Sequence, residues 1–151
     1  MPFELDDGVL YYCNRNRLKE TEVLVPEGLR GIGPDAFKNC FEITRVVLPE
    51  GMTFIAKGAF YFCESLEEIV LPRSLREIGE EALAGCESLR SIVLPEGLRV
   101  IGDYAFICSG LEEIVIPDSV EKLGYASLAG CKSLKSVQLP EHLRAAYEDY
   151  F

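Results

Sequence analysis

Cysteine is the residue type in this sequence with the widest choice of chemistry, because thiols pair as disulfides, ligate metals and act as nucleophiles. Five of the six cysteines recur at a nearly constant spacing, at Cys40, Cys63, Cys86, Cys108 and Cys131. Steps of 22 or 23 residues do not resemble the close C-x-x-C pairs of zinc sites. We expect an inward-facing column of small, buried side chains, with disulfides between neighbours as the second interpretation. Cys13 lies outside this series, and it is the thiol we expect to be reactive.

The other residues with catalytic potential lack the partners that a reaction needs. His142 is the only histidine, and we expect it to be solvated in a Pro-Glu-His turn. Gly31-Ile32-Gly33 is not followed by the third glycine of a dinucleotide loop. Paired acids could hold a hard cation, but neighbours on a strand point to opposite faces; the pairs are Glu67-Glu68, Glu80-Glu81 and Glu112-Glu113. We therefore predict no enzymatic activity, no cofactor and no metal site.

Composition narrows the classes of partner. The chain has 151 residues, of which 48% are hydrophobic, so we expect a real core. Its net charge of −10 would repel a phosphate backbone, which argues against nucleic acid as a partner. No apolar run approaches the roughly 18 residues of a membrane span, so we predict no membrane insertion. The N-terminus lacks a basic start and an apolar stretch, which with unpaired cysteines favours the cytoplasm. The alternative is a cell-surface or secreted location, should the chain be part of a longer protein.

The elements that position these residues follow a repeat. Prolines share the spacing of the cysteines, with steps of 23 residues and one step of 22, at Pro26, Pro49, Pro72, Pro95, Pro117 and Pro140. The aligned unit is I-G-x-x-A-F-x-x-C-x-x-L-x-x-I-V-L-P-x-x-L-x-x. We place the single missing residue between Phe106 and Cys108, in a turn. A period of this length predicts a solenoid, in which each coil buries the apolar side chains of the next.

Each unit contains one short strand and one tight turn. The β-branched triplet before each proline predicts a parallel strand, as in Ile69-Val70-Leu71, and proline ends it. The A-F-x-x-C stretch predicts a helical turn on the outer arc, because it is too short for a stable helix. The recurrent glycine, as in Gly79, predicts a backbone conformation that glycine adopts readily; because Ala56 replaces it once, a positive φ is not strictly required there. The expected fold class is an α/β-type, right-handed repeat solenoid.

The two ends of the chain depart from the repeat. Residues 3–18 contain two apolar runs around Asp7-Gly8, which predicts a β-hairpin that caps the first coil. Leu143, Tyr147 and Tyr150 recur at helical spacing, with Phe151 last, which predicts a C-terminal capping helix or a truncated repeat. We therefore expect a single domain over 1–151, with a cap at 1–20, five to six repeats over 21–140 and a second cap at 141–151.

The repeat unit resembles the BspA-type, or Treponema pallidum type, leucine-rich repeats of bacteria and some protozoa. The similarity covers about residues 21–145, and the hairpin before it resembles the lead-in common in that family. The resemblance implies a leucine-rich-repeat solenoid. It also implies a surface protein that adheres to proteins or cells, and it implies no catalytic residues.

One set of residues predicts a binding face. If Ile69 and Leu71 point into the core, Val70 points outward, and so do its counterparts in the other coils. These outward residues form a stripe of Leu24, Val47, Val70, Val93, Val115 and Gln138, with a charged rim that includes Arg45, Glu67, Glu68, Arg90, Glu112 and Glu113. An apolar centre with a charged rim is typical of protein interfaces. We predict a non-catalytic scaffold that binds a protein, or a second copy of itself, through this face. The alternatives are high strand propensity alone, and a carbohydrate-binding adhesin that uses Tyr61, Phe62 and Tyr104.

Overall fold

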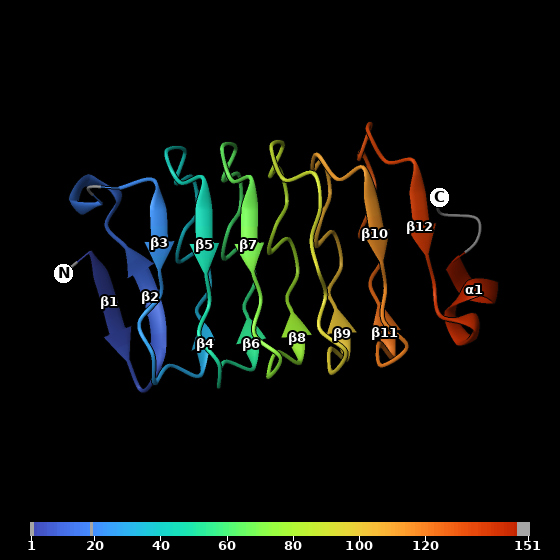
Figure 1. Cartoon of the computed structure of the whole chain (residues 1–151), viewed down its shortest axis with the longest axis horizontal. Helices are drawn as coiled ribbons and strands as arrows, with labels where there is room; N and C mark the ends of the chain where they lie inside the picture. Colours follow the sequence, from blue (N-terminus) through green and yellow to red (C-terminus); the bar gives the residue numbers. More distant parts are fainter. Residues whose placement is uncertain (1, 19, 148–151) are drawn as a thin grey trace.

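The computed structural model describes residues 2–18 and 20–147, and it is a solenoid of short parallel strands (Figure 1). We number the six coils by the segments that lie side by side along one face: 22–24, 45–47, 68–70, 91–93, 113–115 and 136–138. The predicted solenoid is confirmed. Little of the chain is helical: a short 3₁₀ helix, η1 (Arg15–Arg17), and one α-helix, α1 (Glu141–Tyr147).

The N-terminal hairpin forms as predicted. Strand β1 (Phe3–Asp6) pairs antiparallel with β2 (Val9–Cys13), and Asp7 and Gly8 between them both have positive φ. Two positive φ angles in a two-residue loop match the twist of a hairpin. Strand β2 then pairs in parallel with the segment Gly31–Ile32 of the next coil, so the hairpin adds two strands to one end of that sheet.

The first face of the solenoid is a seven-stranded sheet in the order β1-β2-β4-β6-β8-β9-β11. Its short parallel members are β4 (Gly31–Ile32), β6 (Phe54–Ile55), β8 (Glu77–Ile78), β9 (Val100–Ile101) and β11 (Lys122–Leu123). They occupy the I-G part of the repeat, where the sequence did not predict a strand. The second residue of each points into the core: it is isoleucine in four of them, with Ile78 and Ile101 fully buried, and Leu123 in β11.

The second face, which we call the strand row, holds the triplets that the prolines follow. It comprises β3 (Glu22–Leu24), β5 (Arg45–Val47), β7 (Glu68–Val70), the segment 91–93, β10 (Glu113–Val115) and β12 (Ser136–Gln138). Strands β3, β5 and β7 form one parallel sheet, and β10 and β12 form another. Within the described ranges, residues 91–93 pair with neither sheet, although their sequence resembles that of the other triplets. The strand row is therefore open at the fourth coil.

The outer arc is built from tight turns, so the predicted helical turn is wrong. In the second coil the amides of Lys38 and Cys40 donate to the carbonyls three residues earlier, at 3.1 Å each. Asp35 and Asn39 both have positive φ, and the same two positions have positive φ in later coils. A left-handed residue cannot continue a right-handed helix, so the backbone reverses at each of them. Amides of these turns also donate to the next coil, as Phe60 does to Ala82 (2.8 Å).

The recurrent glycine is explained by a close approach between coils. Gly79 does not have a positive φ, but a Cβ there would lie 2.8 Å from the amide nitrogen of Lys57 and 3.0 Å from the carbonyl oxygen of Ile55. A Cβ essentially never lies this close to backbone atoms, so substitution would force the two coils apart. The glycine at this position is thus explained by the space between coils and not by an unusual backbone conformation.

The missing residue of the short coil is not where the sequence alignment placed it. Cys108 has positive φ, and its amide donates to the carbonyl of Ala129, just as the amide of Gly85 donates to that of Ile107. Cys108 is thus the counterpart of Gly85, and Ser109 takes the place of Cys86. The deletion lies between Ser109 and Leu111, where Gly110 donates to the carbonyl of Cys86 (3.0 Å).

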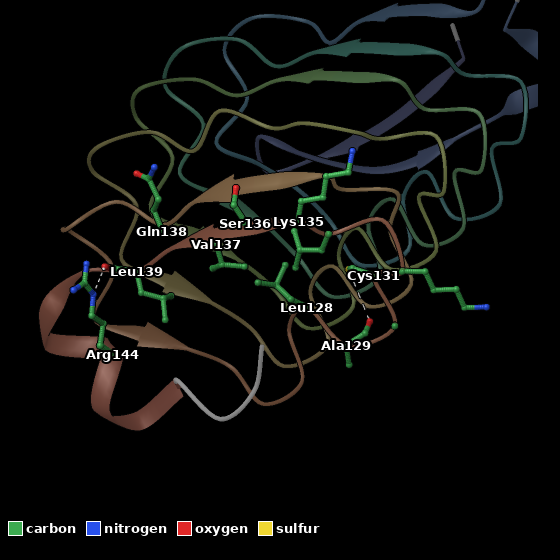
Figure 2. Close-up of a pocket in the computed structure, with 12 residues that line it drawn as sticks. Leu128, Ala129, Cys131, Lys135, Ser136, Val137, Gln138, Leu139 and Arg144 are labelled. Carbon is green, nitrogen blue, oxygen red and sulfur yellow. Dashed lines mark hydrogen bonds between the residues drawn. The ribbon is translucent and has the colours of Figure 1, made fainter.

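The C-terminal helix is confirmed as far as it is described. Helix α1 buries Leu143 against the stack, and Tyr147 packs on the same core. The other two residues of the predicted helical pattern, Tyr150 and Phe151, lie outside the described residues. Among the described residues, helix α1 leaves a hollow at the last coil that is lined in part by β12 (Figure 2).

Candidate functional site

The predicted outward stripe lies along the strand row, because side chains alternate across each strand. Strand register places Leu24 beside Val47 and Val47 beside Val70, and it places Val115 beside Gln138. The residues one position earlier point inward, as the buried Val46 and Ile69 do. Val93 projects from the open segment between the two groups, with 86% of its surface exposed; Leu24 is 66% and Val115 55% exposed. Val47 and Val70 are half-buried.

The opening at the fourth coil makes a cleft in this face. We call it the β7 cleft: its volume is about 680 Å³, and it lies between β7 and residues 91–97. Between the paired coils of the strand row, the residue after the outward side chain donates to the next coil, as Leu48 does to Val70 and Ile116 to Gln138; within the described residues Leu94 makes no such bond to Val115. In the described part of the chain, no such bond joins Leu71 to Val93. The cleft therefore has strand β7 on one wall and the unpaired segment 91–97 on the other, with Val70 and Val93 among its lining residues.

The short fifth coil explains which side of the fourth coil opens. Gly110 donates to Cys86 and Glu112 donates to Arg90 (2.9 Å), so two bonds tie this corner of the fourth coil to the fifth. A Cβ on Gly110 would lie 2.0 Å from the carbonyl oxygen of Glu87, which shows how tightly the two coils meet. The amide of Arg90 makes no corresponding bond to the third coil within the described residues. At this corner the fourth coil thus follows the fifth, whereas further along the strand row residues 91–93 pair with neither β7 nor β10.

Charges flank the stripe and connect successive coils. Arg45 donates to Glu68 (2.8 Å) and to Glu22, and these two carboxylates raise its pKa. Arg90 lies 3.9 Å from Glu112 of the next coil, so opposite charges are adjacent there too. Glu113 is exposed and pairs across the strands with Ser136. Glu67, which directly precedes β7, is exposed as well. Surface pairs of this kind contribute little to stability but orient a partner.

The cysteine column is confirmed for four of the five repeat cysteines. The thiols of Cys63 and Cys86 donate to the carbonyls of Phe37 and Phe60 in the preceding coil, at 3.1 and 3.3 Å. The thiol of Cys131 likewise donates to the carbonyl of Phe106 (3.1 Å). It lies 3.3 Å from the hydroxyl of Ser109, which occupies the cysteine position of the fifth coil. Burial raises the pKa of Cys63, and it raises that of Cys86 to about 12. All six cysteines fall among the described residues and are free thiols.

Two cysteine predictions are wrong. Cys108 does not point inward, because it occupies the left-handed turn position and is exposed. Cys13 is not an accessible thiol: it extends the buried column, is 2% exposed, and shares a hydrogen bond with Cys40. That bond and burial raise the pKa of Cys13, whereas the bond lowers that of Cys40.

Thiol labelling at pH 8 should therefore find one fast-reacting cysteine in the folded protein. We expect Cys108→Ser to abolish the fast phase and Cys13→Ser to leave it unchanged. Cys63 and Cys86 should react only after unfolding, because they are buried and protonated at this pH. A fast phase that persists in Cys108→Ser would contradict this placement.

The remaining candidates do not converge on a reaction centre. His142 is exposed, and its Nε2 lies 2.8 Å from the carbonyl oxygen of Val120. Over the residues that the structure describes, no group of three or more His, Cys, Asp or Glu side chains could hold a metal ion. The rings of Tyr61 and Phe62 lie 4.6 Å apart, and Lys38 covers Tyr61, so these aromatic faces are partly occupied. None of the described helices has the length and apolar character to cross a membrane.

The strand row and the column of inward isoleucines, leucines and cysteines together define a leucine-rich-repeat solenoid. The BspA-type leucine-rich repeat model matches residues 10–151 in six copies. The chain therefore belongs to the BspA-type leucine-rich repeat family, as its repeat unit predicted.

Solved structures of bacterial proteins share this fold. A leucine-rich repeat protein of T. pallidum is 29% identical with a TM-score of 0.79, and the match covers 92% of this chain and 79% of that one. A leucine-rich repeat protein of Bacteroides ovatus is 32% identical with a TM-score of 0.79, and the match covers 93% of this chain and 39% of that one. A leucine-rich cell surface protein of Faecalibacterium prausnitzii is 31% identical with a TM-score of 0.79, and the match covers 90% of this chain and 37% of that one. The chain thus spans less than two fifths of the last two proteins. No curated protein matches this chain.

Proposed function

We propose that this protein is a non-catalytic interaction module that binds another protein through the strand row, with the β7 cleft at the centre of the contact. The observation that carries the proposal is the exposure of Val93 beside the cleft, in a stripe that is otherwise apolar up to Gln138. Burying large exposed apolar side chains is the main source of affinity at protein interfaces. Leucine-rich-repeat membership supports an interaction or surface-binding role.

The charged rim would set the orientation of the partner. Glu68, Arg73 and Glu96 line the β7 cleft, and Arg90 and Glu113 lie in the neighbouring coils. Rim charges of both signs favour one arrangement over others and make association sensitive to salt. The partner is therefore expected to present an apolar centre with charges of both signs around it.

Changing Val70 and Val93 together to lysine should abolish partner capture. Two ammonium groups on either side of the cleft would have to be desolvated in the complex, which is costly. The measurement is affinity capture from native lysate with immobilised wild-type and variant protein, alongside thermal melting of each. Val100→Lys is the matched control, because Val100 is a half-buried outward valine of the opposite sheet. Both proteins should melt nearly as the wild type does.

The outcomes separate this proposal from its alternative, an adhesin-like module that binds carbohydrate or a cell surface. The cell-surface protein of F. prausnitzii among the similar structures supports such a setting. Capture that survives Val70→Lys with Val93→Lys would exclude the strand row as the site. Binding to a glycan array that is unaffected by the two lysines, but lost on changing Tyr61, would favour the adhesin.

A further inference from the structure

Backbone groups of β7 are unpaired on the side that faces the β7 cleft, where no strand lies between β7 and β10 (Figure 1). At the joint between β5 and β7, the carbonyl of Thr44 accepts from Glu67 (2.8 Å), and the amide of Leu48 donates to Val70 (3.0 Å). The counterparts of Thr44 and Leu48 one coil further on are Glu67 and Leu71. Within the described residues, the carbonyl of Glu67 accepts no backbone bond and the amide of Leu71 donates none.

The same pattern assigns further groups to the two walls of the cleft. In a parallel sheet, backbone groups of successive residues face opposite neighbours, so the N–H and C=O of Ile69 face the fourth coil together with Glu67 and Leu71. On the other wall, Ser91 and Val93 are the counterparts of residues of β7 that face β5, and neither makes a backbone bond in the described chain. Each wall therefore directs two donors and two acceptors into the cleft.

The surroundings of these groups favour a ligand that brings a main chain of its own. Ile69 is buried at 5% exposure, and Ile92 and Leu94 in the opposite wall are buried as well. Unpaired backbone groups among buried residues cost free energy, because they have lost hydrogen bonds to bulk water. A ligand that supplies the missing donors and acceptors gains more here than one that offers apolar contact alone.

The shape of the cleft suits an extended chain. Its walls run along the strand direction, from Glu68 to Arg73 on one side and over residues 91–97 on the other. Its volume of about 680 Å³ lies in the range of roughly 300–1,000 Å³ that is usual for ligand sites. In the part of the chain that is described, no backbone bond ties residues 91–97 to a neighbouring coil. This wall can therefore shift to make room without breaking a hydrogen bond.

We propose that the β7 cleft binds an extended segment of a partner protein by β-strand addition to the free edge of β7. This inference rests on the binding role proposed above and specifies the form that the partner takes. The amides of Ile69 and Leu71 would donate to the segment, and the carbonyls of Glu67 and Ile69 would accept from it. Outward side chains of the segment would be apolar, because they would continue the stripe between Val70 and Val93.

A capped peptide with the sequence of residues 44–50 is the probe, because this stretch contains β5, which already pairs with β7. Amide hydrogen exchange followed by NMR reports on each backbone bond separately. In the free protein, Ile69 and Leu71 should exchange at least about tenfold faster than Val46 and Leu48, their bonded counterparts in the second coil. Millimolar peptide should slow the exchange of Ile69 and Leu71 by about tenfold or more.

The matched control is the same peptide with both valine amides N-methylated, which keeps every side chain and removes the donors that a strand needs. It should leave the exchange of Ile69 and Leu71 unchanged. Equal slowing by the two peptides would overturn the proposal, because contact would then be through side chains alone. Slow exchange of both amides already in the free protein would overturn it too, because the edge of β7 would be paired. So would a probe peptide that slows neither amide.

Combining this experiment with partner capture separates the two proposals. Capture that is lost on changing Val70 and Val93 to lysine, with no slowing of Ile69 and Leu71 by the peptide, would leave the proposed function standing and overturn strand addition. Slowing of these amides by the probe alone, with capture that survives the two lysines, would support strand addition and overturn the strand row as the site of the captured partner. If both proposals hold, excess probe peptide should displace the captured partner from the immobilised protein.

Discussion

Replacing Phe60 by alanine should lower the free energy of unfolding by about 3–5 kcal/mol, the usual loss for a fully buried phenylalanine. Phe60 is fully buried and stacks on Phe37, with ring centroids 4.9 Å apart and planes 10° apart. Each inner coil depends on its two neighbours for cover, so the cavity would weaken the contacts of the third coil on both sides. The change would remove a large fraction of the roughly 5–15 kcal/mol that holds a typical domain together.

Chemical denaturation of the two proteins measures this loss, and Phe41→Ala is the control. Phe41 is exposed, and its ring lies 5.8 Å from the guanidinium of Arg15, a contact that contributes about 0.5–1 kcal/mol at a surface. Both variants lose the same atoms, so their difference isolates the effect of burial. Equal losses in the two variants would show that Phe60 is not part of the core.

Much of the fold follows from the period and from side-chain alternation. The shared spacing of proline and cysteine predicts stacked coils, and the inward Ile69 and outward Val70 follow from the geometry of a strand. Asp7-Gly8 predicts the hairpin because both residues tolerate a positive φ. These features depend on residue types within one coil, which the sequence displays directly.

The features that were not predicted depend on how coils fit together. Aligning cysteine with cysteine placed Cys108 in the column, but serine is also small enough to fill that place, as Ser109 does. The opening beside Val93 has no local signal, since Ser91-Ile92-Val93 is as suited to a strand as its neighbours. It arises one coil further on, where Gly110 draws the fourth coil toward the fifth.

Deleting residues 73–95 should yield a folded, shorter solenoid. The deletion removes one whole period and joins Pro72 to Glu96, which restores the Pro-Glu sequence that now occurs at Pro95. Because contacts are mainly between neighbouring coils, the third coil can meet the fifth through the same inward residues. Circular dichroism should keep its strand character, and thermal melting should remain cooperative at a lower temperature. Deleting only residues 73–84 is the control, since half a coil destroys the register and should leave the chain unfolded.

The same deletion also removes one wall of the β7 cleft and brings two acidic strands together. Removing the fourth coil should place β7 directly beside β10, so that Glu68 would face Glu113, whereas in the intact chain the fourth coil, with the uncharged Ser91 at the equivalent position, separates the two. Like charges opposite each other on a sheet are destabilising by a fraction of a kcal/mol, on the order of 0.2–1. Added salt should therefore raise the melting temperature of the shortened protein more than that of the wild type, because salt screens this repulsion.

The shortened protein should also lose partner capture, because it lacks Val93 and the cleft. An unfolded product would contradict nearest-neighbour stability, whereas a folded product that still captures the partner would separate binding from the cleft.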